Sequence, residues 1–214
     1  MKKLIYTLFA VLLITPIFAQ NSSEAKSLLD KVSANYQTKS SMYLKFSSVL
    51  ENTQAKTKDS YNGEVYIKGN QYNLTVPKMD IKQIYDGKKL YTIATDQQEV
   101  TVTSPEANSD ELFTPTRVLE MYKKGYTLTM DQTKKVNGRN VTFVKLVPTD
   151  KASIKHILVG VDKTNNELVQ LVETNTNNTT TTITVEKQLN DIIVPKSLLS
   201  FNKAFYKDFY ISEI

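Results

Sequence analysis

The chain has 214 residues, 40% of them hydrophobic, and a formal net charge of +5 at pH 7. It contains no cysteine, which excludes disulfides, thiolate nucleophiles, thiolate metal sites and a lipid-modified cysteine. The positive charge is spread over many lysines and only two arginines, Arg117 and Arg139, so the sequence lacks the focused basic face typical of nucleic-acid-binding proteins.

The first 19 residues are typical of an export signal. Lys2 and Lys3 precede an apolar stretch over residues 4–18, and the small Ala19 stands before the polar Gln20. We expect cleavage after Ala19 and a periplasmic location; the alternative is a retained N-terminal anchor, although the stretch is shorter than the roughly 20 residues of a membrane span. Cleavage leaves 195 residues with a net charge of +3, enough for one domain with a sizeable core.

Two amphipathic helices are predicted. The first runs from a cap at Asn21 or Ser22 to about Lys39, and the second covers residues 114–124, with a proline at its first helical position. Apolar residues recur at helical spacing in both, so each is expected to bury one face. These residues are Ala25, Leu28, Leu29, Val32 and Tyr36 in the first helix, and Val118, Leu119 and Tyr122 in the second.

The rest of the chain reads as short strands in which apolar and polar residues alternate. Turn signals such as Asp86-Gly87 and Asn137-Gly138 separate them. About eleven strands are predicted, and an open twisted sheet of more than roughly ten strands has to curl or split. We therefore expect a mainly β fold with an α lid. It would be an unclosed antiparallel β-barrel of about eleven strands, covered by two or three helices, as a single domain over residues 20–214.

The same alternation predicts which side chains line the concave face of the curled sheet. Ordinary core packing is the alternative for each of them, because apolar alternation marks a buried face without showing whether the space beside it is filled. The candidates for an apolar binding cavity are Val65, Ile67, Tyr72, Leu74, Tyr91, Ile93, Val100 and Val102 from the strands, with Val118 and Leu119 from the second helix.

Residues that could support catalysis or metal binding have simpler interpretations. His156, the single histidine, is expected to point to solvent from a strand, and no nucleophile motif accompanies it. Asp80, Asp86 and Asp96 each stand beside a predicted turn, where aspartate commonly bonds its own backbone, and their spacing matches no calcium loop. We therefore expect no enzymatic activity, no cofactor and no metal site.

Five short motifs follow one another in a characteristic order. They are Leu29-Asp-Lys-Val-Ser, Gly63-Glu-Val-Tyr-Ile-Lys, Asp86-Gly-Lys-Lys-Leu-Tyr, Glu99-Val-Thr-Val, and Thr114-Pro before an amphipathic helix. Together they resemble the LolA-like family of periplasmic outer-membrane lipoprotein carriers. Their order and spacing match over residues 24–125, whereas the C-terminal half matches only as a succession of strands.

The resemblance implies a monomeric carrier that accepts the acyl chains of lipoproteins from an inner-membrane ABC lipoprotein-release transporter and delivers them to the outer membrane. An outer-membrane receptor is a further partner that it implies. A carrier must supply an apolar cavity, because each exposed methylene costs about 0.8 kcal/mol. Two alternatives remain: a periplasmic lipid-binding sensor, and an accessory protein of a lipid-modifying pathway.

One position departs from the family pattern. In the family, an arginine followed by proline usually ends the strand that here covers residues 63–68, and the arginine helps to hold the empty lid closed. This chain has Gly69-Asn70 at that place. The lid mechanism of the family, and the handover to a lipid-anchored receptor, are therefore not carried over unchanged.

Overall fold

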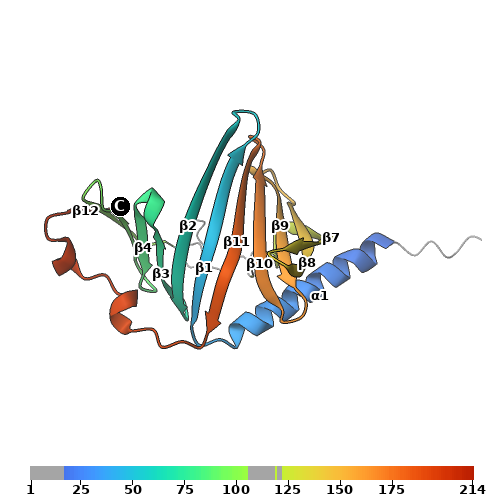
Figure 1. Cartoon of the computed structure of the whole chain (residues 1–214), viewed down its shortest axis with the longest axis horizontal. Helices are drawn as coiled ribbons and strands as arrows, with labels where there is room; N and C mark the ends of the chain where they lie inside the picture. The colour runs from blue at the N-terminus through green and yellow to red at the C-terminus, as the bar shows by residue number, and fades with distance from the viewer. Residues whose placement is uncertain (1–16, 106–118, 120–121) are drawn as a thin grey trace, which may run out of the picture.

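The computed structural model describes residues 17–105, 119 and 122–214, and its strands form one continuous twelve-stranded sheet (Figure 1). The strand order is β12-β6-β5-β4-β3-β2-β1-β11-β10-β9-β8-β7. Neighbouring strands are antiparallel, apart from β12, which pairs with β6 in parallel. Because β12 and β7 are the two edges and do not pair with each other, the sheet is unclosed, which confirms the predicted mainly β, open architecture.

The strands of the N-terminal half are β1 (Met42–Asn52), β2 (Thr57–Lys68), β3 (Gln71–Val76), β4 (Ile81–Tyr85), β5 (Leu90–Ala94) and β6 (Glu99–Thr103). Those of the C-terminal half are β7 (Tyr126–Val136), β8 (Arg139–Pro148), β9 (Ile154–Asp162), β10 (Glu167–Asn175), β11 (Thr179–Asn190) and β12 (Tyr210–Glu213). The helices are α1 (Ile17–Gln37) and the 3-10 helices η1 (Pro77–Met79), η2 (Lys196–Leu199) and η3 (Lys203–Tyr206).

Helix α1 lies against the half of the sheet that contains β7 to β10 (Figure 1). Its five predicted apolar residues are all buried, which confirms the amphipathic face. The predicted start at Asn21 or Ser22 is wrong for this chain, because the helix continues through the preceding residues to Ile17. It ends at Gln37, two residues before the predicted end.

Most of the predicted second helix, residues 114–124, lies outside the described residues. Leu119 is described as helical and is buried, and Tyr122 begins a turn that leads into β7. In the part of the chain that the structure describes, one α-helix and three short 3-10 helices have defined bounds, so the predicted two or three covering helices are not matched there. No helix among these residues is long and apolar enough to cross a membrane.

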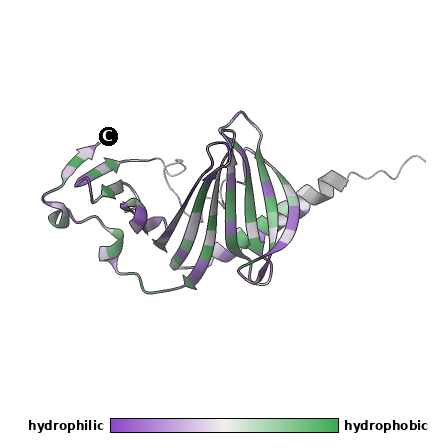
Figure 2. Ribbon diagram, turned by 45° about the horizontal axis from the view of Figure 1, so that its top comes forward, coloured by the Kyte–Doolittle hydropathy of each residue, from purple (hydrophilic) through white to green (hydrophobic). Residues whose placement is uncertain are grey.

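The sheet buries apolar side chains on both of its faces, and hydrophobic and hydrophilic residues alternate along the central strands (Figure 2). We call the face that packs on α1 the inner face; its cluster joins the apolar stripe of α1 to residues of β1 to β5 and β7 to β11. On the opposite, outer face of β4 to β6, residues 191–214 run from the end of β11 across to β12 (Figure 1) and contribute to a second cluster. A third cluster lies on β7 to β10.

Candidate functional site

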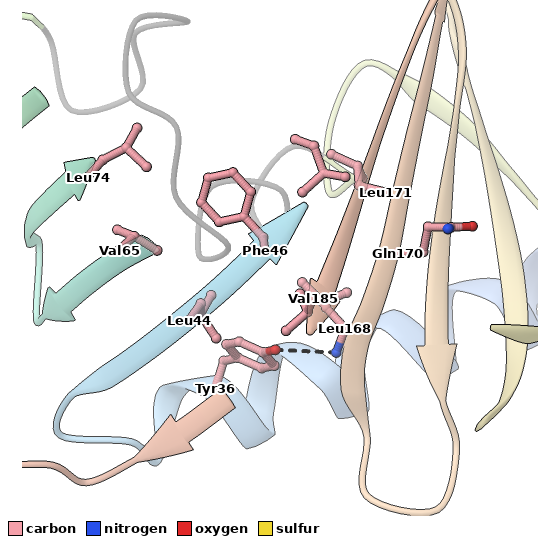
Figure 3. A pocket seen from close by; sticks show the side chains of 10 residues that line it. Tyr36, Leu44, Phe46, Val65, Leu74, Leu168, Gln170, Leu171 and Val185 are labelled. Carbon is pink, nitrogen blue, oxygen red and sulfur yellow. Dashed lines mark hydrogen bonds between the residues drawn. The ribbon is translucent and has the colours of Figure 1, made fainter. Parts of the chain in front are cut away.

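A pocket opens on the inner face between α1 and the strands β1, β2, β3, β10 and β11 (Figure 3). About 630 Å³ inside it is free of atoms, counting the part open to solvent. In Figure 3, Val65 and Leu74 lie on one side and Leu171 and Val185 on the other, with Phe46 between them. The lining consists of Tyr36, Leu44, Phe46, Val65, Leu74, Leu168, Gln170, Leu171, Ile183 and Val185.

The lining of the pocket is mostly hydrocarbon. None of the ten residues is charged. Among them, only the Gln170 amide and the Tyr36 hydroxyl are polar side-chain groups. The Gln170 amide donates to the Thr184 hydroxyl at 2.9 Å, and Figure 3 shows it pointing away from the other lining side chains. The pocket therefore offers a ligand an apolar surface with little capacity for hydrogen bonding.

Tyr36 closes the end of the pocket next to α1. Its hydroxyl donates to Gln188 Oε1 at 2.8 Å and accepts from the Leu168 backbone N–H at 3.3 Å (Figure 3). The pairing of β10 with β11 begins only at Gln170, so Leu168 lies beyond the paired part of these two strands. Burial raises the pKa of Tyr36 well above its ordinary value, so the hydroxyl stays protonated at neutral pH. It thus ties α1 to β10 and β11.

Phe46 lies on the inner face directly opposite Gly63 in the pairing of β1 with β2. A Cβ atom built on Gly63 would lie only 2.4 Å from Phe46 Cζ, so the ring rests on the glycine backbone. The missing side chain at Gly63 is therefore what allows the ring to adopt this position, an arrangement known from other sheets in which an aromatic residue covers a glycine.

Two of the ten predicted cavity residues, Val65 and Leu74, line this pocket, where they form a cross-strand pair. Ile67 and Tyr72 form the next pair on the same face and are fully buried in the inner cluster beside the pocket. Leu119 is also buried in that cluster. Val118 lies outside the described residues.

The structure does not bring the other four predicted residues to the pocket. Tyr91, Ile93, Val100 and Val102 belong to the outer-face cluster. They pack there against Phe201, Tyr206, Phe209 and Ile211 of the C-terminal segment. Period-two alternation separates the two faces of a strand but does not say which one is inner.

The register between strands decides which side chains point to the inner face. Tyr85 pairs with Leu90, and both are buried in the inner cluster. The next residue in β5, Tyr91, therefore points outward, and its partner in β6, Val102, does the same.

Six lining residues were absent from the predicted set in addition to Tyr36 and Gln170. Leu44 and Phe46 share the alternation of the first strand, and Ile183 and Val185 share that of the strand after the Asn/Thr-rich turn, so a burial signal was present in the sequence. What the sequence lacked was the pairing of β1 with β11, which joins segments about 140 residues apart and brings both sets together. The pairing of β10 with β11 then places Leu171 opposite Ile183, and Leu168 lies three residues before Leu171 in β10.

Gly69, at the position where the family usually has arginine, lies in the turn between β2 and β3. Its φ of 59° is in the left-handed region that favours glycine, and a Cβ there would meet no atom within 4 Å. An arginine at this place would be strained and would begin in open space.

The histidine and the acidic residues do not gather into a group that could hold a metal ion in the part of the chain that the structure describes. No group of three or more potential metal ligands occurs there. His156 is half-buried on β9, where partial desolvation and Lys145 lower its pKa. Asp86 accepts from the backbone N–H groups of Lys88 and Lys89, as expected for an aspartate in a turn.

A protein-family model described as outer membrane lipoprotein carrier protein LolA matches residues 15–173, about three quarters of the chain. The chain belongs to this LolA family. The match covers α1 and the strands β1 to β9, with most of β10. It leaves out β11 and the C-terminal segment that packs on the outer face. No curated protein matches the chain.

The chain is similar to solved structures at low sequence identity. An uncharacterized conserved protein from Thermus thermophilus is 10% identical, with a TM-score of 0.57 over 89% of this chain and 99% of that one. A LolA superfamily protein from Nitrosomonas europaea is 10% identical, with a TM-score of 0.47 over 83% and 97%. LprF from Mycobacterium bovis is 13% identical, with a TM-score of 0.49 over 82% and 96%. The likeness to the Thermus thermophilus protein shows a shared fold and nothing beyond the fold.

Proposed function

We propose that this LolA-family chain is a periplasmic carrier, which shields acyl chains of lipoproteins in its inner-face pocket and ferries them from the inner to the outer membrane. The observation that carries the proposal is the pocket itself, an uncharged and almost wholly apolar space enclosed by α1 and five strands. In this proposal, residues 1–19 are the export signal and residues 20–214 are the mature carrier domain.

The energetics favour a hydrocarbon ligand over a polar one. Each methylene moved from water into the pocket contributes about 0.8 kcal/mol, whereas a polar group left without a partner among these side chains would cost roughly 1–3 kcal/mol. The polar atoms of Tyr36 and Gln170 already have protein partners. A lipid would therefore place its acyl portion in the pocket and keep its polar head outside.

Loading and release of the lipoprotein would also depend on the apolar character of the pocket. The carrier would receive lipoprotein from an inner-membrane ABC lipoprotein-release transporter and pass it to the outer membrane, directly or through a receptor. Val65 and Leu74, with the other lining residues, would contact the chain. No covalent step is required, because binding and release depend only on the relative free energy of the chain in the pocket and in the membrane.

Native mass spectrometry of the mature protein, purified gently from the periplasm, tests the proposal together with a release assay on spheroplasts. We expect co-purified lipoprotein, and release of newly made lipoproteins from spheroplasts when the protein is added. A protein that carries only a free lipid and releases no lipoprotein would contradict the carrier role and favour the accessory or sensor alternative.

A matched pair of substitutions links the activity to the pocket. Leu171→Gln places an amide in the pocket, whereas Leu158→Gln makes the same change at a partly buried leucine of the outer-face cluster on the neighbouring strand. We expect Leu171→Gln to lose most lipoprotein release and Leu158→Gln to retain it at a comparable thermal stability. Equal loss in both variants would show that the pocket is not the binding site.

A further inference from the structure

The sheet contains two glycines that each lie beneath a phenylalanine of the neighbouring strand. On the inner face, Phe46 of β1 pairs with Gly63 of β2. On the outer face, Phe143 of β8 pairs with Gly160 of β9. The two pairs share their chemistry and their cross-strand geometry, but they have different surroundings.

The Phe46 ring borders unfilled space. It lines the pocket and is 9% exposed, and in Figure 3 it stands between the side chains of β2 and β3 and those of β10 and β11. Phe143, by contrast, is fully buried in the small cluster formed by Val136, Val141 and Val169. Any movement of Phe46 therefore changes the volume of the pocket, whereas a movement of Phe143 only disturbs packing on the other face.

Gly63 limits where the Phe46 ring can lie. The backbone of Gly63 has an ordinary φ, so alanine is compatible with its conformation, but a Cβ there would be 2.4 Å from Phe46 Cζ and 3.0 Å from Cε1 and Cε2. All three contacts involve the outer part of the ring, so the ring would move rather than the backbone. The free space next to it is the pocket.

We propose that the Phe46–Gly63 pair sets the capacity of the pocket and thereby the length of hydrocarbon chain that the protein shields. This inference rests on the proposed function, because it specifies the ligand of the same pocket. Phe46 is a positioning and specificity residue: with glycine beneath it, the ring lies against the sheet and leaves room for the chain. A larger residue beneath it lifts the ring into that room.

The test compares binding of saturated fatty acids, from decanoate to stearate, by the full mature protein and its variants. Each methylene kept out of the pocket weakens binding by up to about fourfold. We expect Gly63→Ala to reduce the affinity for stearate relative to decanoate by about tenfold, the equivalent of roughly two methylenes. Phe46→Ala should change the same ratio in the opposite direction, because it adds space.

Gly160→Ala is the matched control. Its Cβ would lie 2.8 Å from Phe143 Cε1 and from Val141 Cγ1, so its packing cost is similar, but it is remote from the pocket lining. It should leave the ratio of affinities unchanged. An unchanged ratio in both Gly63→Ala and Phe46→Ala, with the fold intact by circular dichroism, would overturn the inference.

A crystal structure of Gly63→Ala separates this inference from the proposed function. Binding of no fatty acid and no lipoprotein by the unaltered protein would overturn the carrier role. The displaced Phe46 ring, together with reduced xenon uptake at the pocket, would still support the role of the pair in setting its capacity. A ring that stays in place while the backbone of β2 shifts would overturn it. Phe46→Ala provides the same test, with increased xenon uptake, if Gly63→Ala does not fold.

Discussion

Similar apolar residues have different surroundings on the two faces of the sheet. On the inner face, Val65 and Leu74 border a pocket with space for a ligand. On the outer face of β5 and β6, Ile93 and Val100 are equally apolar and paired, yet the chain covers them with its own C-terminal segment. The difference shows that burial of a strand face is decided locally, whereas the material that covers the face depends on a distant part of the chain.

Specific contacts hold the C-terminal segment on the outer face. The Phe201 ring stacks on Tyr91 with 4.4 Å between centroids, and Tyr206 stacks on Phe201 at 5.1 Å. The Asn73 side chain, on the same outer face, donates to the Leu198 carbonyl at 2.6 Å. The outer face of this region is therefore a filled core, and the pocket face is the one with room for another molecule.

The largest expected effect is on the filled side. Ile93→Ala should lower the free energy of unfolding by about 2–5 kcal/mol, because Ile93 is 1% exposed and its removal leaves a cavity among packed neighbours. Urea unfolding measures the change, and binding of fatty acids to the folded protein should remain the same. Loss of binding at unchanged stability would contradict the assignment of Ile93 to the outer core.

The second largest loss of unfolding free energy is expected for Tyr36→Phe, at the closed end of the pocket. It leaves the Leu168 N–H and the Gln188 amide without the hydroxyl, at a cost of roughly 1–3 kcal/mol. The effect should depend on pH, because the pKa of Tyr36 is raised on folding by burial.

The sign of that dependence follows from linkage. Above about pH 10 the unfolded tyrosine loses its proton while the folded one keeps it, so stability is lost as the pH rises. Tyr36→Phe should reduce the decline of the unfolding free energy above this pH. Parallel declines in both proteins, measured by urea unfolding across the alkaline range, would contradict the buried, protonated hydroxyl.

Leu74→Ala should be milder than Ile93→Ala, although Leu74 is only 8% exposed. One side of its side chain already faces unfilled space, so fewer packing contacts are lost, and we expect about 1–2 kcal/mol. The affinity of Leu74→Ala for fatty acids should fall as well, whereas that of Ile93→Ala should remain the same. Equal costs for the two substitutions in urea unfolding would indicate that the pocket is as tightly packed as the outer core.

The smallest effect is expected where the C-terminal segment does not pack. Ile193 is 95% exposed, so Ile193→Ser should change the unfolding free energy by no more than about 0.5 kcal/mol. Val194→Ser provides the contrast, because the neighbouring Val194 is 5% exposed and its substitution should be clearly destabilising. Similar effects for both in thermal unfolding would contradict the contacts of this segment.

Local patterns in the sequence predicted much of the fold. The apolar stripe of α1 and the alternating strands depend on neighbours in the chain, and the structure contains both. The chain also turns at Asp86-Gly87, although the connection spans the four residues between Tyr85 and Leu90. The predicted start of α1 is misplaced, because a capping residue such as Asn21 begins a helix only where the preceding residues are not helical themselves. The open, curled sheet followed from the number of strands together with the two predicted helices that would cover it, and its twelve strands are close to the eleven predicted.

The order of residues alone shows which of them are apolar, which alternate and which can turn, because these properties act over a few neighbouring positions. Long-range packing places Val65 at a pocket and Ile93 in a filled core. That choice depends on strand register, on the pairing of β1 with β11, and on the path of residues 191–214 across the outer face. Such contacts join distant segments, so no local pattern specifies them.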